Sequence, residues 1–258
     1  MQIITLTTDW NQQDYYSGII KSYLITSLPD IKIVDITHSI PPFDCRKACF
    51  VVKSVYKSFP ENTVHIVGVR GLKNELPAPP MVIRFKDQWF FGYENNSFVK
   101  MFECEKNVEH WYLPIKFDTT FPELDYLVKT AVEMIKGVDI KETGIKFLLD
   151  SNSKTDNASL KENSITGIVE YIDSYGNAIT NIEKNDFERI CRGRRFEITV
   201  TKRCNAVRKI SQSYNEPSDK LIAVFNILDK LEIAHTNTKA VTTLGITVNS
   251  QVNVIFFN

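Results

Sequence analysis

Residues 31–37 read IKIVDIT, and together with QIITLTT at residues 2–8 and VHIVGV at residues 64–69 they predict three β-strands. Apolar side chains recur at helical spacing over residues 14–28, between the first two strands, and again in the stretch that Asp44 opens, before the third. This alternation is typical of parallel strands with helices packed on them. We expect the stretch 31–37 to be a buried strand of that sheet.

The rest of the chain indicates a second kind of architecture. Residues 81–85 and 88–91 predict a hairpin, and residues 124–135 predict a helix. Residues 150–163, DSNSKTDNASLKEN, are polar and carry no periodicity, which is typical of a linker. Short β-rich segments follow at residues 164–171, 178–182, 195–200, 220–226, 231–234 and 252–257.

These patterns predict a protein of two domains. The N-terminal α/β domain, residues 1–150, has a mainly parallel sheet flanked by helices. A linker covers residues 151–163, and a smaller, mostly-β C-terminal domain covers residues 164–258. A chain of 258 residues is long enough for two modest domains with separate cores.

The charge balance of the chain limits its partners. Lys and Arg total 31, as do Asp and Glu, and a net charge near zero argues against a nucleic acid or an anionic membrane surface. No apolar run approaches the ~20 residues of a spanning helix. The opening residues, MQIITLTTDW, lack the basic and apolar regions of a secretory signal. We therefore expect a cytoplasmic protein that does not contact membranes.

Three side chains follow the ends of the predicted parallel strands: Asp9, His38 and Arg70. In such sheets, ligands bind beyond the carboxyl ends of the strands. Asp9 and Asp14 flank a polar loop there, and two carboxylates could bind a metal, act as acid and base, or grip a diol such as ribose. The alternative for Asp14 is the N-cap of the following helix, and the alternative for His38 is a structural role.

The motifs that the chain lacks further limit the class of ligand it could bind. The chain has no GxGxxG or Walker motif to hold phosphates, and no Cys and His set with metal-ligand spacing. A carboxylate at a strand end without a phosphate loop indicates a nucleoside-type ligand. Residues 173–177, DSYGN, lie between two predicted strands, where they form either a simple hairpin turn or part of a site.

Several segments, in order along most of the chain, resemble the signatures of one family. TDW at residues 8–10, followed by Asp14 five residues after Asp9, is similar to its TDFG opening. The most specific match is VDITHSIPPFD at residues 34–44. Further signatures are matched by residues 59–65 (FPENTVH), 91–96 (FGYENN) and 172–182 (IDSYGNAITNI). The family is that of the S-adenosylmethionine (SAM) hydroxide adenosyltransferases, whose relatives include fluorinase and chlorinase.

The resemblance implies a homotrimer in which SAM binds between the N-terminal domain of one subunit and the C-terminal domain of its neighbour. A nucleophile then displaces methionine from C5′ of the adenosyl group, and no cofactor takes part. By the family's pattern, Asp9 holds the ribose hydroxyls with Asp14 nearby, and Phe43 stands at the pocket wall. Tyr214 falls where relatives place an aromatic ring that stacks on adenine. The residues expected on the methionine and adenine side are Asp173, Tyr175 and Asn177.

The residues that activate water in the family's hydrolases, an Asp, an Arg and a His, are replaced in this chain. Arg70 stands in the aspartate's place, and Pro122 stands in the histidine's. The arginine's place falls at Pro77 or Ala78. The halogenases' alternatives, a Tyr at the first of these positions and a Ser after the last, are absent too. Water is a poor nucleophile unless a base removes its proton. The candidate catalytic residues are therefore Arg70, Glu75 and Glu123.

The sequence thus favours a protein that hydrolyses SAM at C5′ to adenosine and methionine, or performs a variant of that reaction. The alternative is a catalytically degenerate protein that binds SAM or adenosine as a sensor or sink. A third reading is a structural protein with a collapsed pocket, and the retained carboxylates and Asn177 argue against it.

Overall fold

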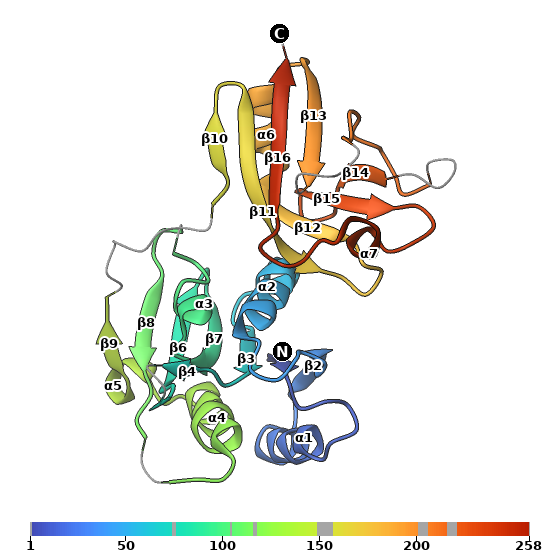
Figure 1. Cartoon of the computed structure of the whole chain (residues 1–258). Helices are drawn as coiled ribbons and strands as arrows, with labels where there is room; N and C mark the ends of the chain where they lie inside the picture. Colours follow the sequence, from blue (N-terminus) through green and yellow to red (C-terminus); the bar gives the residue numbers. More distant parts are fainter. Residues whose placement is uncertain are drawn as a thin grey trace. The chain divides into compact units, whose positions relative to one another are not determined.

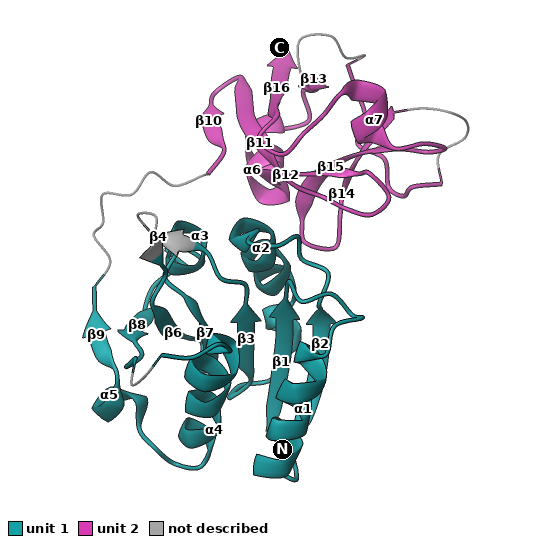
Figure 2. Ribbon diagram, turned by 60° about the horizontal axis from the view of Figure 1, so that its bottom comes forward, with its two compact units in different colours: residues 1–153 teal, residues 154–258 magenta. Residues whose placement is uncertain are grey.

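The computed structural model describes residues 2–73, 76–103, 105–115, 118–148, 157–200, 206–215 and 221–257. The chain divides into two units, Met1–Ser153 and Lys154–Asn258 (Figures 1 and 2). The first unit is an α/β structure around a mixed sheet, and the second is built on an antiparallel sheet. The predicted fold class is confirmed.

The sheet of the first unit contains β1 (Ile3–Thr8), β2 (Lys32–Thr37), β3 (Val64–Gly68), β6 (Pro80–Phe85), β7 (Gln88–Tyr93), β8 (Glu109–Tyr112) and β9 (Ile145–Phe147). The strand order is β2-β1-β3-β7-β6-β8-β9. β2, β1, β3 and β7 are parallel neighbours, whereas β6, β8 and β9 add antiparallel pairs. The hairpin predicted from the sequence is β6–β7 and is confirmed. A separate short pair joins β4 (Leu72–Lys73) to β5 (Leu76–Pro77).

Helices cover both faces of this sheet: α1 (Tyr16–Ser27), α2 (Cys45–Val55), η1 (Tyr56–Ser58), α3 (Asn96–Val99), η2 (Glu123–Val128), α4 (Lys129–Ile135) and α5 (Ile140–Thr143). α2 begins where the sequence predicts, because the side chain of Asp44 caps it by accepting a hydrogen bond from the Lys47 N–H at 2.9 Å. The helix predicted near residues 124–135 is also confirmed. Its first part, η2, is a π-helix, a rare form that is frequent at functional sites.

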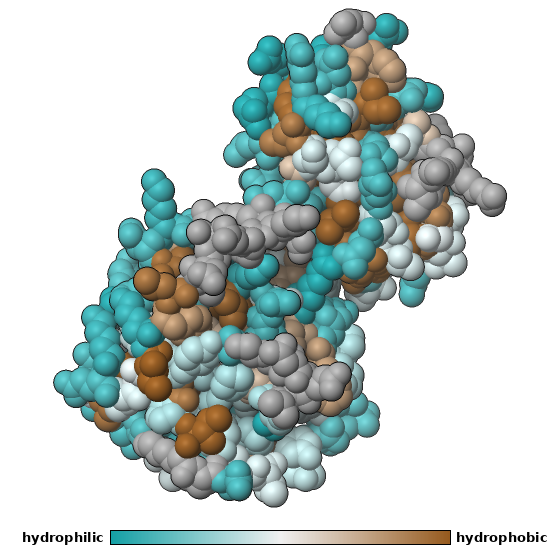
Figure 3. All heavy atoms as spheres, turned by 60° about the vertical axis from the view of Figure 1, so that its left-hand side comes forward, coloured by the Kyte–Doolittle hydropathy of each residue, from teal (hydrophilic) through white to brown (hydrophobic). Residues whose placement is uncertain are grey.

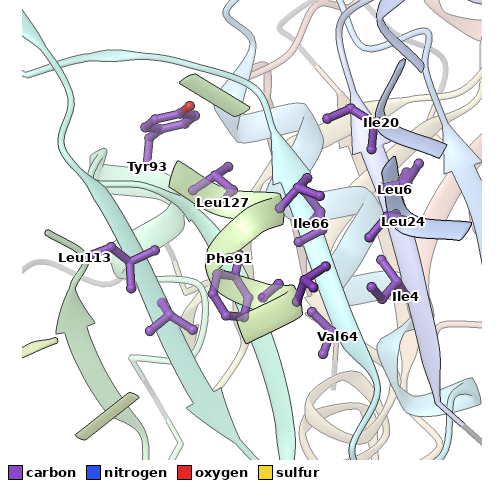
Figure 4. Packing of buried hydrophobic residues seen from close by; sticks show 14 of the residues in the cluster. Ile4, Leu6, Ile20, Leu24, Val64, Ile66, Phe91, Tyr93, Leu113 and Leu127 are labelled. Carbon is purple, nitrogen blue, oxygen red and sulfur yellow. The ribbon is translucent and has the colours of Figure 1, made fainter. Parts of the chain in front are cut away.

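The two faces of the sheet bury different side chains because neighbouring residues of a strand point to opposite sides. Ile66 and Phe91 belong to the core that includes Leu24 of α1 and Leu127 of η2 (Figure 4). Val67, one residue after Ile66, joins the core formed with α2 and α3 on the other face. The strands are thus held on both sides, which fixes where their carboxyl ends lie.

One expectation about the sheet is wrong. The stretch 31–37 forms strand β2, but this strand lies at the edge of the sheet and its side chains are half-buried or exposed. Val34, for example, is 37% exposed. The apolar run predicts a strand correctly, but burial also requires a second neighbouring strand, and in the described part of the chain β2 pairs only with β1.

The second unit is an antiparallel sheet with the order β13-β16-β11-β12-β15-β14, and β10 pairs with β11. Its elements are β10 (Ser159–Lys161), β11 (Ser164–Ile172), β12 (Ala178–Glu183), α6 (Lys184–Cys191), β13 (Arg195–Val200), β14 (Leu221–Phe225), β15 (Lys230–His235), α7 (Ala240–Leu244) and β16 (Gln251–Phe257). The β-rich segments predicted from the sequence all form strands. Its core includes Val169, Ile198 and Val254 from three strands and Phe187 from α6.

The predicted linker, residues 151–163, is partly structured. Its first part lies outside the described residues, but Ser159–Lys161 forms β10 and pairs with β11. The polar composition hides this strand because all three of its side chains are exposed. Apolar side chains form separate small groups on the face drawn in Figure 3. Among the described residues, none of the helices combines the length and the apolar composition that crossing a membrane requires.

Candidate functional site

The carboxyl ends of the parallel strands bring the expected residues to one edge of the first sheet. Asp9 follows β1, His38 follows β2, and Arg70 follows β3 by two residues. The side chain of Asp9 accepts a hydrogen bond from the Phe43 N–H at 2.9 Å at its Oδ2 atom. Phe43 has a φ of 66°, which is unusual for a bulky residue. Such strained backbone clusters at functional sites, and here it aims an N–H group at a carboxylate.

Asp9 is a partly buried carboxylate. Burial raises its pKa, because the charged form loses hydration, while the hydrogen bond from the Phe43 N–H opposes that shift. The ring of Phe43 itself is 74% exposed in the single chain. Asp9 is therefore fixed from the protein side, and the large apolar ring beside it is available to a ligand or to another subunit.

Arg70 turns toward the sheet edge. Its guanidinium carbon lies 5.7 Å from the centre of the Tyr93 ring, at the end of β7. Its Nε atom is buried and has no hydrogen-bond partner within the described part of the chain. Arg70 therefore packs against the end of β7 and does not extend freely into solvent.

Glu123, the first residue of η2, completes this group. It is only 9% exposed, and the Tyr93 hydroxyl donates a hydrogen bond to its Oε1 atom at 3.1 Å. Burial raises the pKa of Glu123 and the charge of Asp9 raises it further, whereas the Tyr93 hydrogen bond and the charge of Arg70 oppose the shift. The same surroundings raise the pKa of the Tyr93 hydroxyl, which therefore remains a donor at neutral pH.

Gly68, at the end of β3, lies close to Thr8, Trp10 and Glu123. A Cβ atom at Gly68 would lie 3.1 Å from Cγ2 of Thr8, 3.2 Å from the Trp10 ring and 3.5 Å from Cγ of Glu123. The first two distances are tight, whereas the third is an ordinary van der Waals contact. The end of β3 is thus the point where the elements that carry Asp9 and Glu123 meet.

Two other groups near this edge have structural or unreactive character. His38 is 3% exposed, its Nδ1 lies 2.7 Å from the Thr8 hydroxyl, and its Nε2 lies 3.3 Å from Asp35. Burial raises the pKa of the Cys45 thiol to about 11, and the nearby charge of Asp9 contributes to this rise. A neutral thiol is a weak nucleophile, so Cys45 is poorly suited to covalent catalysis.

The remaining residues singled out in the first unit have varied positions. Asp14 is exposed, and it does not cap α1, because the N-cap of that helix is Tyr15. Pro122 is the N-cap of η2, directly before Glu123. Ala78 is buried after β5. Glu75 lies outside the described residues. Within the described ranges, no group of three or more His, Cys, Asp and Glu side chains is arranged to hold a metal ion.

The second unit presents its candidate residues on a hairpin turn and in a pocket. Residues 173–177 connect β11 to β12, as the turn interpretation predicts. The carboxylate of Asp173 accepts hydrogen bonds from the Asn177 N–H at 2.8 Å and from its side-chain amide at 3.0 Å. Gly176 has a φ of 79°, a conformation that glycine adopts without strain. The ring of Tyr175 is 78% exposed.

Tyr214 lines a pocket of about 380 Å³ within the second unit. Its hydroxyl donates to Oε1 of Glu232 at 3.0 Å, and the Asn226 side chain donates to Oε2 at 2.9 Å. Glu232 is 3% exposed, and burial raises its pKa. The volume falls in the usual range for small-molecule pockets. The other lining residues are Ile179, Gln212, Ser213, Val224, Phe225, Ile227 and Leu228.

Sequence reasoning missed two functional candidates, Tyr93 and Glu232. Tyr93 lies inside the segment FGYENN, whose resemblance to a family signature was the only signal for it. Glu232 stands in the β-rich segment near residues 231–234, and no local pattern marks it as a pocket residue. Both become visible only when distant elements are brought together.

Both units match models of a single class of proteins. The model of the SAM hydroxide adenosyltransferase N-terminal domain matches residues 4–144, and that of the C-terminal domain matches residues 167–253. The chain belongs to the SAM hydroxide adenosyltransferase family.

Two relatives agree with this membership, and a solved structure shares the fold. The chain is 26% identical to an (R)-S-adenosyl-L-methionine hydrolase of Methanocaldococcus jannaschii, over 99% of this chain and 97% of the relative. It is 22% identical to a fluorinase of Nocardia brasiliensis, over 77% of each. A crystal structure of an uncharacterized conserved protein from Thermotoga maritima is similar in fold, with a TM-score of 0.83 and 21% identity over 99% of this chain and 100% of that one.

Proposed function

We propose that the protein hydrolyses SAM at C5′ of the adenosyl group, with water as the nucleophile and adenosine and methionine as the products. The observation that carries this proposal is the pair of carboxylates, the partly buried Asp9 and the buried Glu123, at the carboxyl edge of the first sheet of a member of this family. Asp9 has the chemistry to accept hydrogen bonds from the two ribose hydroxyls. Glu123 adds a second negative charge near the place where a sulfonium cation would sit.

The chemistry makes modest demands on the protein. The sulfur of SAM is already positively charged, so methionine leaves as a neutral thioether and no acid is needed to expel it. What remains is to hold C5′ in line with a water molecule and to remove a proton from that water. Partly buried groups serve this purpose because the electrostatic interactions of a dry site are stronger than those in water.

The second unit supports the same proposal by offering surfaces for the rest of the ligand. We propose that Asp173, Tyr175 and Asn177 contact the methionine and adenine side, and that Tyr214 stacks on adenine. The exposed rings of Tyr175 and Tyr214 suit a site that is completed on ligand binding or on assembly of three copies of the chain. A cytoplasmic location, where SAM is made, fits the same function.

The alternative of a sensor or sink without turnover is not favoured. Two relatives that span most of the chain bear the names of enzymes, a SAM hydrolase and a fluorinase. At the edge where the family's water-activating residues are missing, Tyr93 donates a hydrogen bond to the buried carboxylate of Glu123, and Arg70 lies over the Tyr93 ring. A protein that only binds SAM does not need this arrangement.

The proposal is tested by incubating the purified protein with SAM and separating the products by chromatography. Because one relative is named for the (R) sulfonium epimer, the (R) and (S) epimers are tested separately. We expect adenosine and methionine in equal amounts from at least one epimer, and loss of both products in Asp9→Ala. Absence of adenosine from both epimers, or formation of another adenosyl product, would contradict hydrolysis at C5′.

A further inference from the structure

The water-activating residues of the family's hydrolases are absent from this chain, so a reaction with water needs a base from elsewhere. At the edge that holds the partly buried Asp9, the described residues offer a second carboxylate, Glu123, which is buried. Glu123 directly follows Pro122 and is the first residue of the π-helix η2, which begins near the ends of β1 and β3. We propose that Glu123 is the general base that takes the proton from the attacking water, and that Tyr93 and Arg70 position its carboxylate. This inference rests on the proposed function.

The surroundings of Glu123 suit such a role. Tyr93 donates to one oxygen of the carboxylate, Oε1, at 3.1 Å, and this fixes the orientation of the group. Tyr93 is itself 1% exposed and lies beneath the Arg70 guanidinium, so its ring has little freedom. Glu123 itself is buried, with 9% of its surface exposed. The carboxylate is therefore held in one orientation in a largely dry environment.

The charges of the group favour water over an anionic nucleophile. Arg70 alone would attract an anion and repel the sulfonium of SAM. Asp9 lies near enough to Glu123 for its charge to raise the pKa of Glu123, and Arg70 acts on Glu123 with the opposite sign. With all three groups ionised, the edge carries one net negative charge. That balance stabilises a cation and opposes the entry of a halide.

The proposed step balances as follows. The oxygen of water attacks C5′ while the bond between C5′ and sulfur breaks, and the electron pair of that bond goes to sulfur. One proton of the water passes to the Glu123 carboxylate, so the products are adenosine, neutral methionine thioether and a protonated Glu123. Release of that proton to solvent returns the base to its starting state.

Asp9 is the obvious competitor for the role of base, because its pKa is also raised by burial. Its Oδ2 atom is already engaged by the Phe43 N–H, and its place after β1 suits it to the ribose. The charged and titratable groups that face Glu123 are Tyr93 from β7, Arg70 after β3, Asp9 after β1 and Tyr16 from α1. A test must therefore separate Glu123 from Asp9.

The first test compares Glu123→Gln with Asp125→Asn, a matched change of a carboxylate to an amide two residues further along the same helix. Asp125 contacts Thr119 and pairs with Lys129, away from the proposed base. We expect Glu123→Gln to lower kcat by about 10²–10⁴-fold, the usual contribution of a general base. Its Kd for SAM, from titration calorimetry, should change far less than kcat, since Asp9 and the other residues that we place on the ligand remain. Asp125→Asn should keep wild-type kcat.

The second test is the dependence of kcat on pH. In the wild type, kcat should rise with pH through the raised pKa of Glu123, because only the ionised carboxylate accepts a proton. This rise should be absent from the residual activity of Glu123→Gln. Tyr93→Phe removes a hydrogen bond that lowers the pKa of Glu123, so the rise should move to higher pH while the Kd for SAM is retained. A merely structural role for Tyr93 would not shift the profile.

The possible outcomes are distinct. Near-wild-type kcat in Glu123→Gln, or a pH profile unchanged by that substitution, would overturn the assignment and leave Asp9 or another group as the base. A folded wild-type protein that neither binds nor cleaves SAM would overturn the proposed function itself, and the assignment with it. If Glu123→Gln fails to fold by circular dichroism, the shift of the pH profile in Tyr93→Phe decides the question. A halide-dependent product from SAM would contradict water as the nucleophile.

Discussion

The two units hold their candidate carboxylates in different ways. In the first unit, Glu123 is buried and takes its hydrogen bond from Tyr93, which is about thirty residues away in the chain. In the second unit, Asp173 lies on a turn and is bonded by Asn177, four residues further on. The first arrangement depends on several strands and a helix, whereas the second is made within one hairpin.

This difference separates reactivity from recognition. Burial among distant elements raises the pKa values of Asp9 and Glu123, and such shifts are frequent at functional sites. The local turn keeps Asp173 oriented and leaves the ring of Tyr175 exposed, which suits contact with a ligand. We therefore expect substitution of Glu123 to affect turnover most, and substitutions of Asp9 and of the candidate residues in the second unit to affect affinity.

Among the substitutions that compare ligand binding by the two units, Asp9→Ala should have the largest effect. It removes a carboxylate that we place on the ribose hydroxyls and leaves the Phe43 N–H without its acceptor. Charge-assisted hydrogen bonds contribute about 1.5–3 kcal/mol, so the Kd for SAM should rise about 10–100-fold, with a parallel loss of turnover. Titration calorimetry measures the affinity, and Asp30→Ala, an exposed carboxylate after α1, is the control. Equal effects of the two substitutions would argue against a ribose contact.

Tyr214→Ala tests whether the second unit contributes to ligand recognition. Loss of stacking between an aromatic side chain and a base costs about 1–3 kcal/mol, so the Kd for adenosine should rise roughly 5–100-fold. Tyr214→Phe keeps the ring and removes only the hydrogen bond to Glu232, so its Kd should change by less than about fivefold. If the two variants bind adenosine equally, the ring does not contact the base.

Gly176→Ala tests whether the shape of the turn matters. At this position φ is 79°, and a Cβ atom would lie 2.5 Å from Cβ of Lys239. We expect a loss of about 1–3 kcal/mol of unfolding free energy and weaker SAM binding. Gly193→Ala is the matched control, because Gly193 has a φ of 77° but no atom within 4 Å of the added Cβ. It should cost about 1 kcal/mol or less and leave binding unchanged. Thermal unfolding and calorimetry distinguish the two, and equal losses of affinity would contradict the steric account.

Lys21→Met should have the smallest effect. Partial burial acts to raise the pKa of Asp35, but the hydrogen bond and charge of Lys21, 2.5 Å away, outweigh it and leave the pKa lowered. A lowered carboxyl pKa stabilises the fold above the unfolded-state pKa, and this contribution is lost as pH falls through the folded-state pKa. Because the pair is partly exposed, the substitution should cost only about 0.2–1 kcal/mol at pH ~7. Urea unfolding at neutral and strongly acidic pH should show the difference shrinking at acidic pH. A difference that persists there would contradict the ionic explanation.

Much of the fold could be predicted from the sequence because its signals are local. Apolar runs and helical spacing identify the strands and helices of the first unit, and Asp44 marks the start of α2. The edge position of β2 and the strand Ser159–Lys161 could not be predicted, because both depend on which strand lies alongside. Pairing partners far apart in the sequence leave no local pattern.

The candidate site could be predicted only in part. Asp9, Arg70 and Glu123 were each identified by position or by resemblance. The contacts of Arg70 and Glu123 with Tyr93 were not, because they require the ends of β3 and β7 and the start of η2 to meet at one edge. The pKa shifts could not be predicted either, since burial in the folded chain produces them. The sequence thus identifies the candidate residues, and the fold determines their burial and therefore their pKa shifts.

The central claim, that water attacks C5′ of SAM, is tested most directly by carrying out the reaction in water enriched in the heavy oxygen isotope. Mass spectrometry of the products then locates the solvent oxygen. We expect adenosine to carry the heavy oxygen at its 5′ hydroxyl and methionine to carry none. Adenosine without the label, or no adenosine at all, would contradict this account.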